Sequence, residues 1–108
     1  MTKPRNEGLD PREVISPRDR WVLLEVLYEG ENFSMAIGRW KNPTHWQPCL
    51  ALRWNGKKGE KGNPVSHGYP TWFNVPDELA EVLLQTELVT REKREFAARI
   101  LAGRRMSQ

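Results

Sequence analysis

Two runs of alternating apolar and polar positions lie next to each other between residues 21 and 40 and predict a β-hairpin. WVLLEVLY (21–28) is rich in β-branched and aromatic residues, and EGEN after it supplies a turn. FSMAIGRW (33–40) is then the antiparallel partner. Its odd positions from Phe33 to Ile37 are large and apolar, and they predict a core face. Its even positions are small up to Trp40, so this second face leaves room for a flat group.

The following segments predict a third strand, a long loop and a short fourth strand. Two prolines argue against a central strand over 41–48, which we predict to be a connection. CLALRW (49–54) restores the alternation of a strand. Residues 55–70 hold four glycines, two prolines and three lysines, a composition typical of a functional loop. TWFNV (71–75) then predicts the fourth strand.

Amphipathic helical patterns follow this strand. Pro76, with Asp77 and Glu78 after it, predicts a helix start, because proline is tolerated in the first turn and carboxylates are favourable there. Thr90 is a second candidate N-cap, and Gly103 predicts a helix end. The expected apolar positions are Leu79, Val82, Leu83 and Thr86 in the first stretch and Phe96, Ala97, Ile100 and Leu101 in the second. The pattern leaves open whether one helix or two is present.

The order of these elements predicts an α+β domain over residues 21–105. Its four strands form an antiparallel sheet, and one or two C-terminal helices follow, because nothing alternates in the way a parallel sheet requires. Residues 1–20 hold three prolines and few apolar anchors, and they predict a flexible N-terminal arm. A folded part of about 85 residues buries little surface per residue, so we expect a homodimer.

Composition narrows the class of protein. The 108 residues are 38% hydrophobic and 29% charged, which is typical of one soluble domain. No apolar run approaches the roughly 20 residues that span a bilayer, and the N-terminal residues lack an apolar signal core, so we expect a cytoplasmic protein. A single cysteine, Cys49, excludes an intrachain disulfide and is expected to pack as a small hydrophobe.

Charge and aromatic residues gather in one part of the chain. The net charge is only +3, but six cations stand against Glu60 alone between Arg39 and Pro70, where most of the five tryptophans also lie. Aromatic rings that stack on bases and cations that neutralise phosphates are what binding of single-stranded DNA or RNA requires. The candidate nucleic-acid-binding residues are Arg39, Trp40, Lys41, Trp46, Arg53, Trp54, Lys57, Lys58, Lys61 and Trp72.

The stretch LALRW, NGKKGEKG and TWFNVPDELAEVLL resembles the single-stranded-DNA-binding domain of the transcriptional coactivator positive cofactor four and, more loosely, the Whirly proteins. The resemblance implies a curved four-stranded sheet, a dimer formed through the C-terminal helix, and a transcription or replication accessory factor. It also implies that single-stranded nucleic acid binds the sheet surface through Arg53, Trp54, Lys57, Lys58, Lys61 and Trp72. The chain departs from this family in the extra loop segment NPVSHGYP, in Val75 before Pro76, and in the basic C-terminal extension.

Other interpretations of the same residues stay open. The tryptophans also suit a hydrophobic core, or a protein–protein interaction module without nucleic-acid binding, because tryptophan and arginine are the preferred anchors of protein interfaces. Nucleotide binding is not expected, since GKKGEKG has neither the Walker nor the GxGxxG spacing. His45, Cys49 and His67 are too few for a structural zinc site. We therefore expect no metal, no cofactor and no enzymatic activity.

Overall fold

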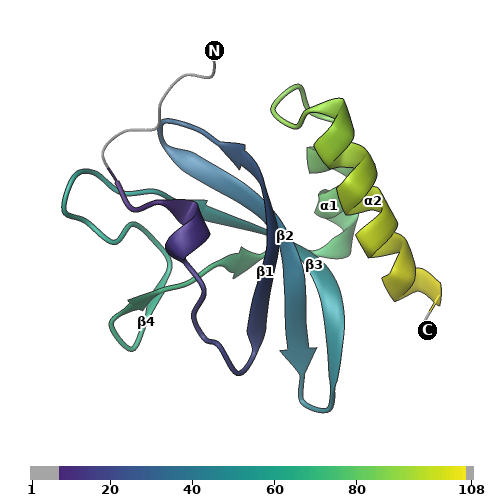
Figure 1. Cartoon of the computed structure of the whole chain (residues 1–108), viewed down its shortest axis with the longest axis horizontal. Coiled ribbons are helices and arrows are strands. Elements are labelled where there is room, and N and C mark those ends of the chain that lie inside the picture. Colours follow the sequence, from purple (N-terminus) through teal and green to yellow (C-terminus); the bar gives the residue numbers. More distant parts are fainter. Residues whose placement is uncertain (1–7, 107–108) are drawn as a thin grey trace.

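A four-stranded antiparallel sheet with two C-terminal helices on one face forms the fold (Figure 1). The computed structural model describes residues 8–106. The elements in chain order are the short 3-10 helix η1 (Pro11–Glu13), β1 (Trp21–Glu29), β2 (Phe33–Asn42), β3 (His45–Trp54), β4 (Val65–Ser66), β5 (Tyr69–Pro70), β6 (Phe73–Asn74), α1 (Asp77–Leu84) and α2 (Arg91–Met106). The sheet has the order β1-β2-β3-β6, and β4 pairs only with β5. The predicted α+β class is confirmed, with two separate helices.

The β2–β3 hairpin is longer than predicted. The two strands pair without interruption from Phe33 opposite Trp54 to Asn42 opposite His45, so only two residues form the turn. The connection predicted for 41–48 is therefore wrong. Pro48 is tolerated inside β3 because β6 pairs with β3 only at Ala51 and Leu52, so β3 has no outer neighbour at Pro48.

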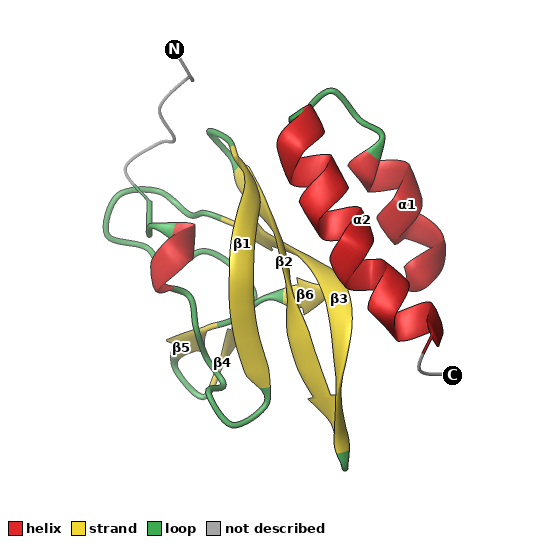
Figure 2. Cartoon of the chain, turned by 45° about the vertical axis from the view of Figure 1, so that its right-hand side comes forward, coloured by secondary structure: helices red, strands yellow, loops and turns green. Residues whose placement is uncertain are grey.

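The main core lies between the sheet and the helices, which Figure 2 shows packed side by side on one face. Met35 and Ile37 of β2 are fully buried there, which confirms the predicted core face of this strand. Leu50 of β3 extends the same layer. The predicted apolar side of α2 is also confirmed, since Ala97 and Leu101 are buried in this core. Phe96 and Ile100 pack against it.

Helix α1 is rotated relative to the prediction, and of the expected apolar residues Leu83 packs against the core. Ala80 and Leu84 face the core, whereas Leu79 and Val82 are 53% and 62% exposed. The reason is Val75, which is buried in the core and whose backbone N–H donates to Leu50 O over 2.8 Å. This anchor fixes the direction in which the chain enters the helix and so decides which side of α1 faces the core. The spacing of apolar residues alone does not predict that side.

Helix α2 begins as predicted and ends later. Thr90 Oγ1 accepts from the backbone N–H of Lys93 at 3.3 Å, the hydrogen bond of an N-cap. The predicted end at Gly103 is wrong, because α2 continues to Met106. Nothing lies within 4 Å of the position of a Cβ at Gly103, so neither packing nor a left-handed turn requires a glycine there.

Arg94 ties α2 to the end of α1. Its guanidinium donates to the carbonyls of Leu84, Val89 and Thr86 over 2.6, 3.1 and 3.4 Å. Replacing Arg94 with methionine keeps much of the side-chain volume but removes these donors, so we expect the free energy of unfolding to fall by about 2 kcal/mol. Urea denaturation measures the change.

The matched control is Arg91→Met on the same helix. The guanidinium of Arg91 pairs with the exposed carboxylate of Glu95, 3.3 Å away at i,i+4, so its replacement should change the stability by about 0.5 kcal/mol or less. Equal effects of the two substitutions would show that the guanidinium of Arg94 does not stabilise the turn between the helices.

The sheet face opposite the helices is covered by the N-terminal segment and by tryptophans. Val14 is fully buried against this face, and the indole N–H of Trp72 donates to Val14 O over 2.8 Å. The ring of Trp21 lies 6.3 Å from that of Trp72, and a Cβ at Gly38 would collide with it. The flat group that this small-residue face accommodates is thus the chain's own Trp21.

The expected flexible arm is therefore wrong for residues 8–20, which pack on the sheet around Val14. The small side chains of Ala36 and Ala51 leave space above the strands, and burying apolar groups in that space stabilises the segment. The remainder of the predicted arm, residues 1–7, lies outside the described residues.

Candidate nucleic-acid interface

Nine of the ten predicted binding residues, all except Trp72, form two separate groups, one at each end of the β2–β3 hairpin. Trp46 lies beside the turn and Trp54 at the far end of β3. At about 3.3 Å per residue, these two positions are about 26 Å apart. The turn end carries Arg39, Trp40, Lys41 and Trp46, and the other end carries Arg53, Trp54, Lys57, Lys58 and Lys61. The sequence cluster therefore does not correspond to one surface.

The turn end is the smaller candidate. Trp40 is half-buried and packs against the cluster around Trp21, which removes it from a stacking role. Lys41 Nζ lies 6.0 Å from the ring centroid of Trp46, at the outer limit of a cation–π contact. This end therefore has one exposed ring, Trp46, and two basic side chains, Lys41 and Arg39, that could contact a nucleic acid.

Two predicted binding residues are buried and have structural roles. Trp72 is 7% exposed and holds the N-terminal segment through Val14. Arg53 is 2% exposed, and its guanidinium donates to Thr71 O over 2.8 Å and to Lys61 O. Alternation along a strand shows which face a side chain is on, but it does not show that the chain itself covers that face. Direct contact of Trp72 with a nucleic acid is therefore excluded in this conformation.

Arg53 also explains a glycine in the lysine-rich loop. Gly62 has φ +69°, and a Cβ there would collide with Trp54 O and the Arg53 guanidinium. Burial lowers the pKa of Arg53 to about 10, because the charged form loses hydration. The loop thus closes over a desolvated cation.

Asn55 fixes the beginning of the loop. It is fully buried, and its amide donates to Gly30 O over 2.8 Å and accepts from Ser34 Oγ at 2.6 Å. Its backbone N–H donates to Asn32 O over 2.9 Å. Sequence reasoning missed this residue, because Asn-Gly indicates a turn but says nothing about a buried amide.

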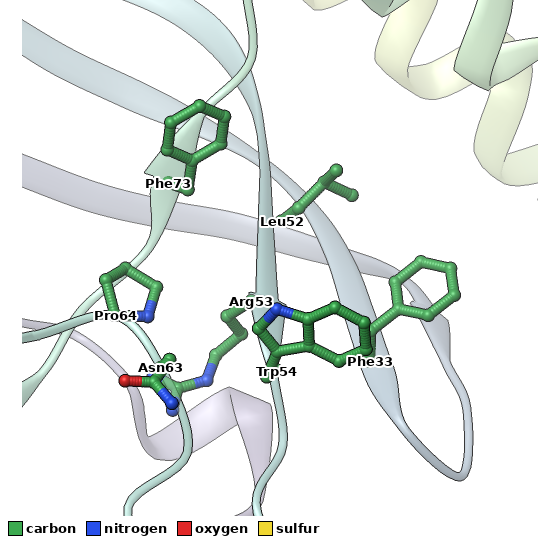
Figure 3. Close-up of a pocket in the computed structure, with 7 residues that line it drawn as sticks. All are labelled: Phe33, Leu52, Arg53, Trp54, Asn63, Pro64 and Phe73. Atoms are coloured by element: carbon green, nitrogen blue, oxygen red, sulfur yellow. The ribbon is translucent and has the colours of Figure 1, made fainter.

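An exposed apolar surface lies at the loop end of the sheet. We call Phe33, Leu52, Trp54 and Phe73 the aromatic patch. Trp54 and Phe73 are 61% and 58% exposed, and Phe73 pairs with Leu52 across the β3–β6 ladder. These residues are on the helix-bearing face, but the helices leave this end of the sheet uncovered (Figure 3). The prediction placed Phe33 in the core with Met35. It missed Phe73, which lies near Trp54 because β6 pairs with β3 at Leu52.

Neighbouring rings hold Trp54 in place. The centroids of Trp54 and Phe33 are 6.4 Å apart with the ring planes at 71°, an edge contact. Phe33 in turn lies 5.2 Å from the ring of Tyr28. Such contacts fix the orientation of an indole that is otherwise exposed, so less conformational entropy is lost when a ligand stacks on it.

A pocket of about 550 Å³ opens within this surface. It is lined by Phe33, Leu52, Arg53, Trp54, Asn63, Pro64 and Phe73 (Figure 3). Its walls are mostly apolar, and none of the lining residues is acidic. Such a pocket suits a flat apolar ligand that carries no positive charge.

The loop after Trp54 presents cations next to the patch. Lys57, Lys58 and Lys61 are all exposed. A tight turn orders the first two, since Glu60 N–H donates to Lys57 O and the Glu60 carboxylate accepts from Lys57 N–H at 2.7 Å. Lys61 Nζ donates to Gly68 O over 2.6 Å, which ties this side chain to the loop. All three lysines are thus candidates for contact with phosphates, and Lys57 and Lys58 stand on the ordered turn next to the patch.

Comparison of the chain with protein-family models, with curated proteins and with solved structures found no match. The resemblance to the positive cofactor four domain stays a prediction. Within residues 8–106, no three His, Cys, Asp or Glu side chains come together as metal ligands. Neither helix of the described part is long and apolar enough to cross a membrane.

Proposed function

We propose that the chain binds single-stranded DNA or RNA with little sequence preference, through the aromatic patch and the lysines of the adjacent loop. The observation that carries this proposal is Trp54, which is 61% exposed, is held by Phe33, and directly precedes the lysine-rich loop. A base stacked on such a ring contributes about 1–3 kcal/mol, and the lysines neutralise the phosphates. A transcription or replication accessory factor would use such binding.

The proposed surface differs from the one expected by resemblance. The small-residue face of β2 and β3 is filled by Trp21 and Trp72, so a strand has no access to it. The aromatic patch lies on the helix-bearing face and joins the loop at Trp54. The proposal therefore rests on a different set of rings, in which Phe33 and Phe73 replace Trp72.

Fluorescence anisotropy of labelled oligo-dT and oligo-U tests the proposal. We expect binding at low salt that weakens in proportion to the logarithm of the salt concentration. Each neutralised phosphate of a single strand contributes about 0.7 to the slope, so the double substitution Lys57→Ala, Lys58→Ala should lower it by about 1.4. Lys41→Ala, at the turn end of the hairpin, is the matched control and should leave the slope unchanged. Absence of binding at low salt would end the proposal.

A protein-interaction role is the second candidate, and the outer side of α1 favours it. Leu79 and Val82 are more than half exposed on this short helix. The expected homodimer forms through the C-terminal helical region. The apolar side of α2 is buried in the chain's own core, so the dimer would use the outer side of α1. An apolar interface of this kind depends much less on salt than nucleic-acid binding does.

Sedimentation of a double variant tests the dimer. We expect the wild-type chain to sediment as a dimer and Leu79→Glu, Val82→Glu to sediment as a monomer, because buried carboxylates without partners oppose association. Ala98→Glu on the exposed side of α2 is the control and should remain dimeric. A monomeric wild-type chain would contradict the dimer while leaving nucleic-acid binding to be judged separately.

A further inference from the structure

The pocket beside Trp54 has the volume and the apolar lining of a site for a small ligand. Its volume of about 550 Å³ lies within the roughly 300–1,000 Å³ of small-ligand sites. The rings of Trp54 and Phe73 both line it, and Leu52 and Pro64 supply further apolar surface. Aromatic side chains in the lining favour a planar ring over a flexible aliphatic chain as the ligand.

Arg53 contributes an unbalanced positive charge at one wall. Its side chain runs from β3 toward Asn63 (Figure 3) and is 2% exposed. Both terminal nitrogens donate to backbone carbonyls, but Nε has no partner, and no carboxylate of the described residues pairs with the guanidinium. A buried cation without a counterion is costly, so a ligand that brings a negative charge to this wall is favoured.

Asn63 places a polar group at the same pocket. Two backbone hydrogen bonds join it to Trp54: the Trp54 N–H donates to Asn63 O over 2.8 Å, and the Asn63 N–H donates to Trp54 O over 3.1 Å. Its exposed side-chain amide makes no hydrogen bond with any described residue. One donor and one acceptor are thus available where the edge of a stacked ring would lie, and a carboxamide pairs well with the edge of a base.

We propose that this pocket receives a single unstacked base of the bound strand, an inference that rests on the proposed function and makes it more specific. The ring stacks on Trp54 and contacts Phe73, and its polar edge meets the amide of Asn63. The phosphate attached to the same nucleotide lies toward the loop lysines, on the side of the pocket where Arg53 is buried. The ligand class is therefore a nucleobase joined to a phosphate, and the strand is its source.

Two oligonucleotides test the inference. The first lacks all its bases, and the second has the same sugar–phosphate backbone with a single 2-aminopurine base. The lysines can bind the phosphates of both strands, whereas the pocket can contribute only to binding of the strand that carries the base. We expect the single base to tighten binding by about 5- to 150-fold, since stacking contributes about 1–3 kcal/mol per base and 1.4 kcal/mol is tenfold. The fluorescence of 2-aminopurine should be quenched as it stacks on Trp54.

Variants of the pocket locate the effect. Leu52→Trp fills the pocket and should abolish the gain from the base while the base-free strand binds as before. If this variant does not fold, Phe73→Ala removes one wall at a side chain that is 58% exposed and should reduce the same gain. Trp46→Ala, at the other end of the hairpin, is the control and should keep the full gain.

The outcomes separate the two proposals. Equal binding of the two strands would overturn the base pocket but leave electrostatic binding of single strands intact. Equally tight binding of free 2-aminopurine nucleoside monophosphate would also overturn it, because the ligand would then be a free nucleotide. Failure of both strands and of oligo-dT to bind at low salt would reject the proposed function itself.

Discussion

Replacing Trp72 with alanine is expected to lower the free energy of unfolding by about 3–5 kcal/mol, the usual cost of removing a large buried aromatic side chain. Trp72 is 7% exposed, packs beside Trp21, and holds the N-terminal segment through its hydrogen bond to Val14 O. The substitution removes the indole that covers the small-residue face of the sheet. Urea denaturation followed by circular dichroism measures the loss.

Two further variants make this result specific. Trp72→Phe keeps most of the apolar volume but loses the N–H donor and leaves Val14 O without it, so a smaller loss of about 1–2 kcal/mol is expected. Trp46→Ala removes a ring that is 41% exposed and should change the stability by about 0.5 kcal/mol. If Trp72→Ala were as stable as Trp46→Ala, the packing of residues 8–20 on the sheet would be refuted.

Replacing Trp54 with alanine should have the opposite profile, with a large effect on binding and a small one on stability. Loss of one stacking platform costs about 1–3 kcal/mol, which lowers the affinity for oligo-dT by about 5- to 150-fold. The ring is 61% exposed, so its contribution to folding is small. Anisotropy titrations and urea denaturation of the same preparation measure both quantities.

Trp54→Phe is the conservative partner of this substitution. A phenyl ring still offers a flat face, so most of the affinity should remain, and the salt slope should equal that of the wild-type chain because the lysines are unchanged. Unchanged affinity of Trp54→Ala would show that the aromatic patch does not contact the strand. Loss of folding would instead show that Phe33 and Trp54 stabilise the sheet more than their exposure indicates.

Local sequence patterns are sufficient to predict the order of the main strands and helices and part of the core. Alternation on β2 identified Met35 and Ile37 as core, and Thr90 was recognised as the cap of α2. These features depend on neighbours within a few residues, which the sequence displays directly. Pro48 shows the limit of such rules, since its place in a strand depends on how far β6 extends along β3.

The other errors come from packing between distant segments. Leu79 and Val82 have helical spacing, but the anchor at Val75 turns α1 so that Ala80 and Leu84 are buried. The N-terminal segment resembles a flexible arm in composition, yet Val14 meets Trp72, 58 positions away. No local pattern reports such a contact.

Half of the candidate site was accessible from the sequence. Trp54 and the lysines were identified because aromatic and basic residues are adjacent there. Phe33 and Phe73 were not, because they join Trp54 only through the register of three strands. The two ends of the hairpin were merged for the same reason, since residues close in sequence along a strand can be far apart in space.

The indole N–H signals of the tryptophans provide the most direct test of which surface meets the strand. In a nitrogen-15 NMR titration with oligo-dT at low salt, we expect the signal of Trp54 to shift and saturate. The signals of Trp21 and Trp72, which lie on the covered face, should stay in place. A shift of Trp46 without a shift of Trp54 would move the interface to the turn end of the hairpin and contradict the account.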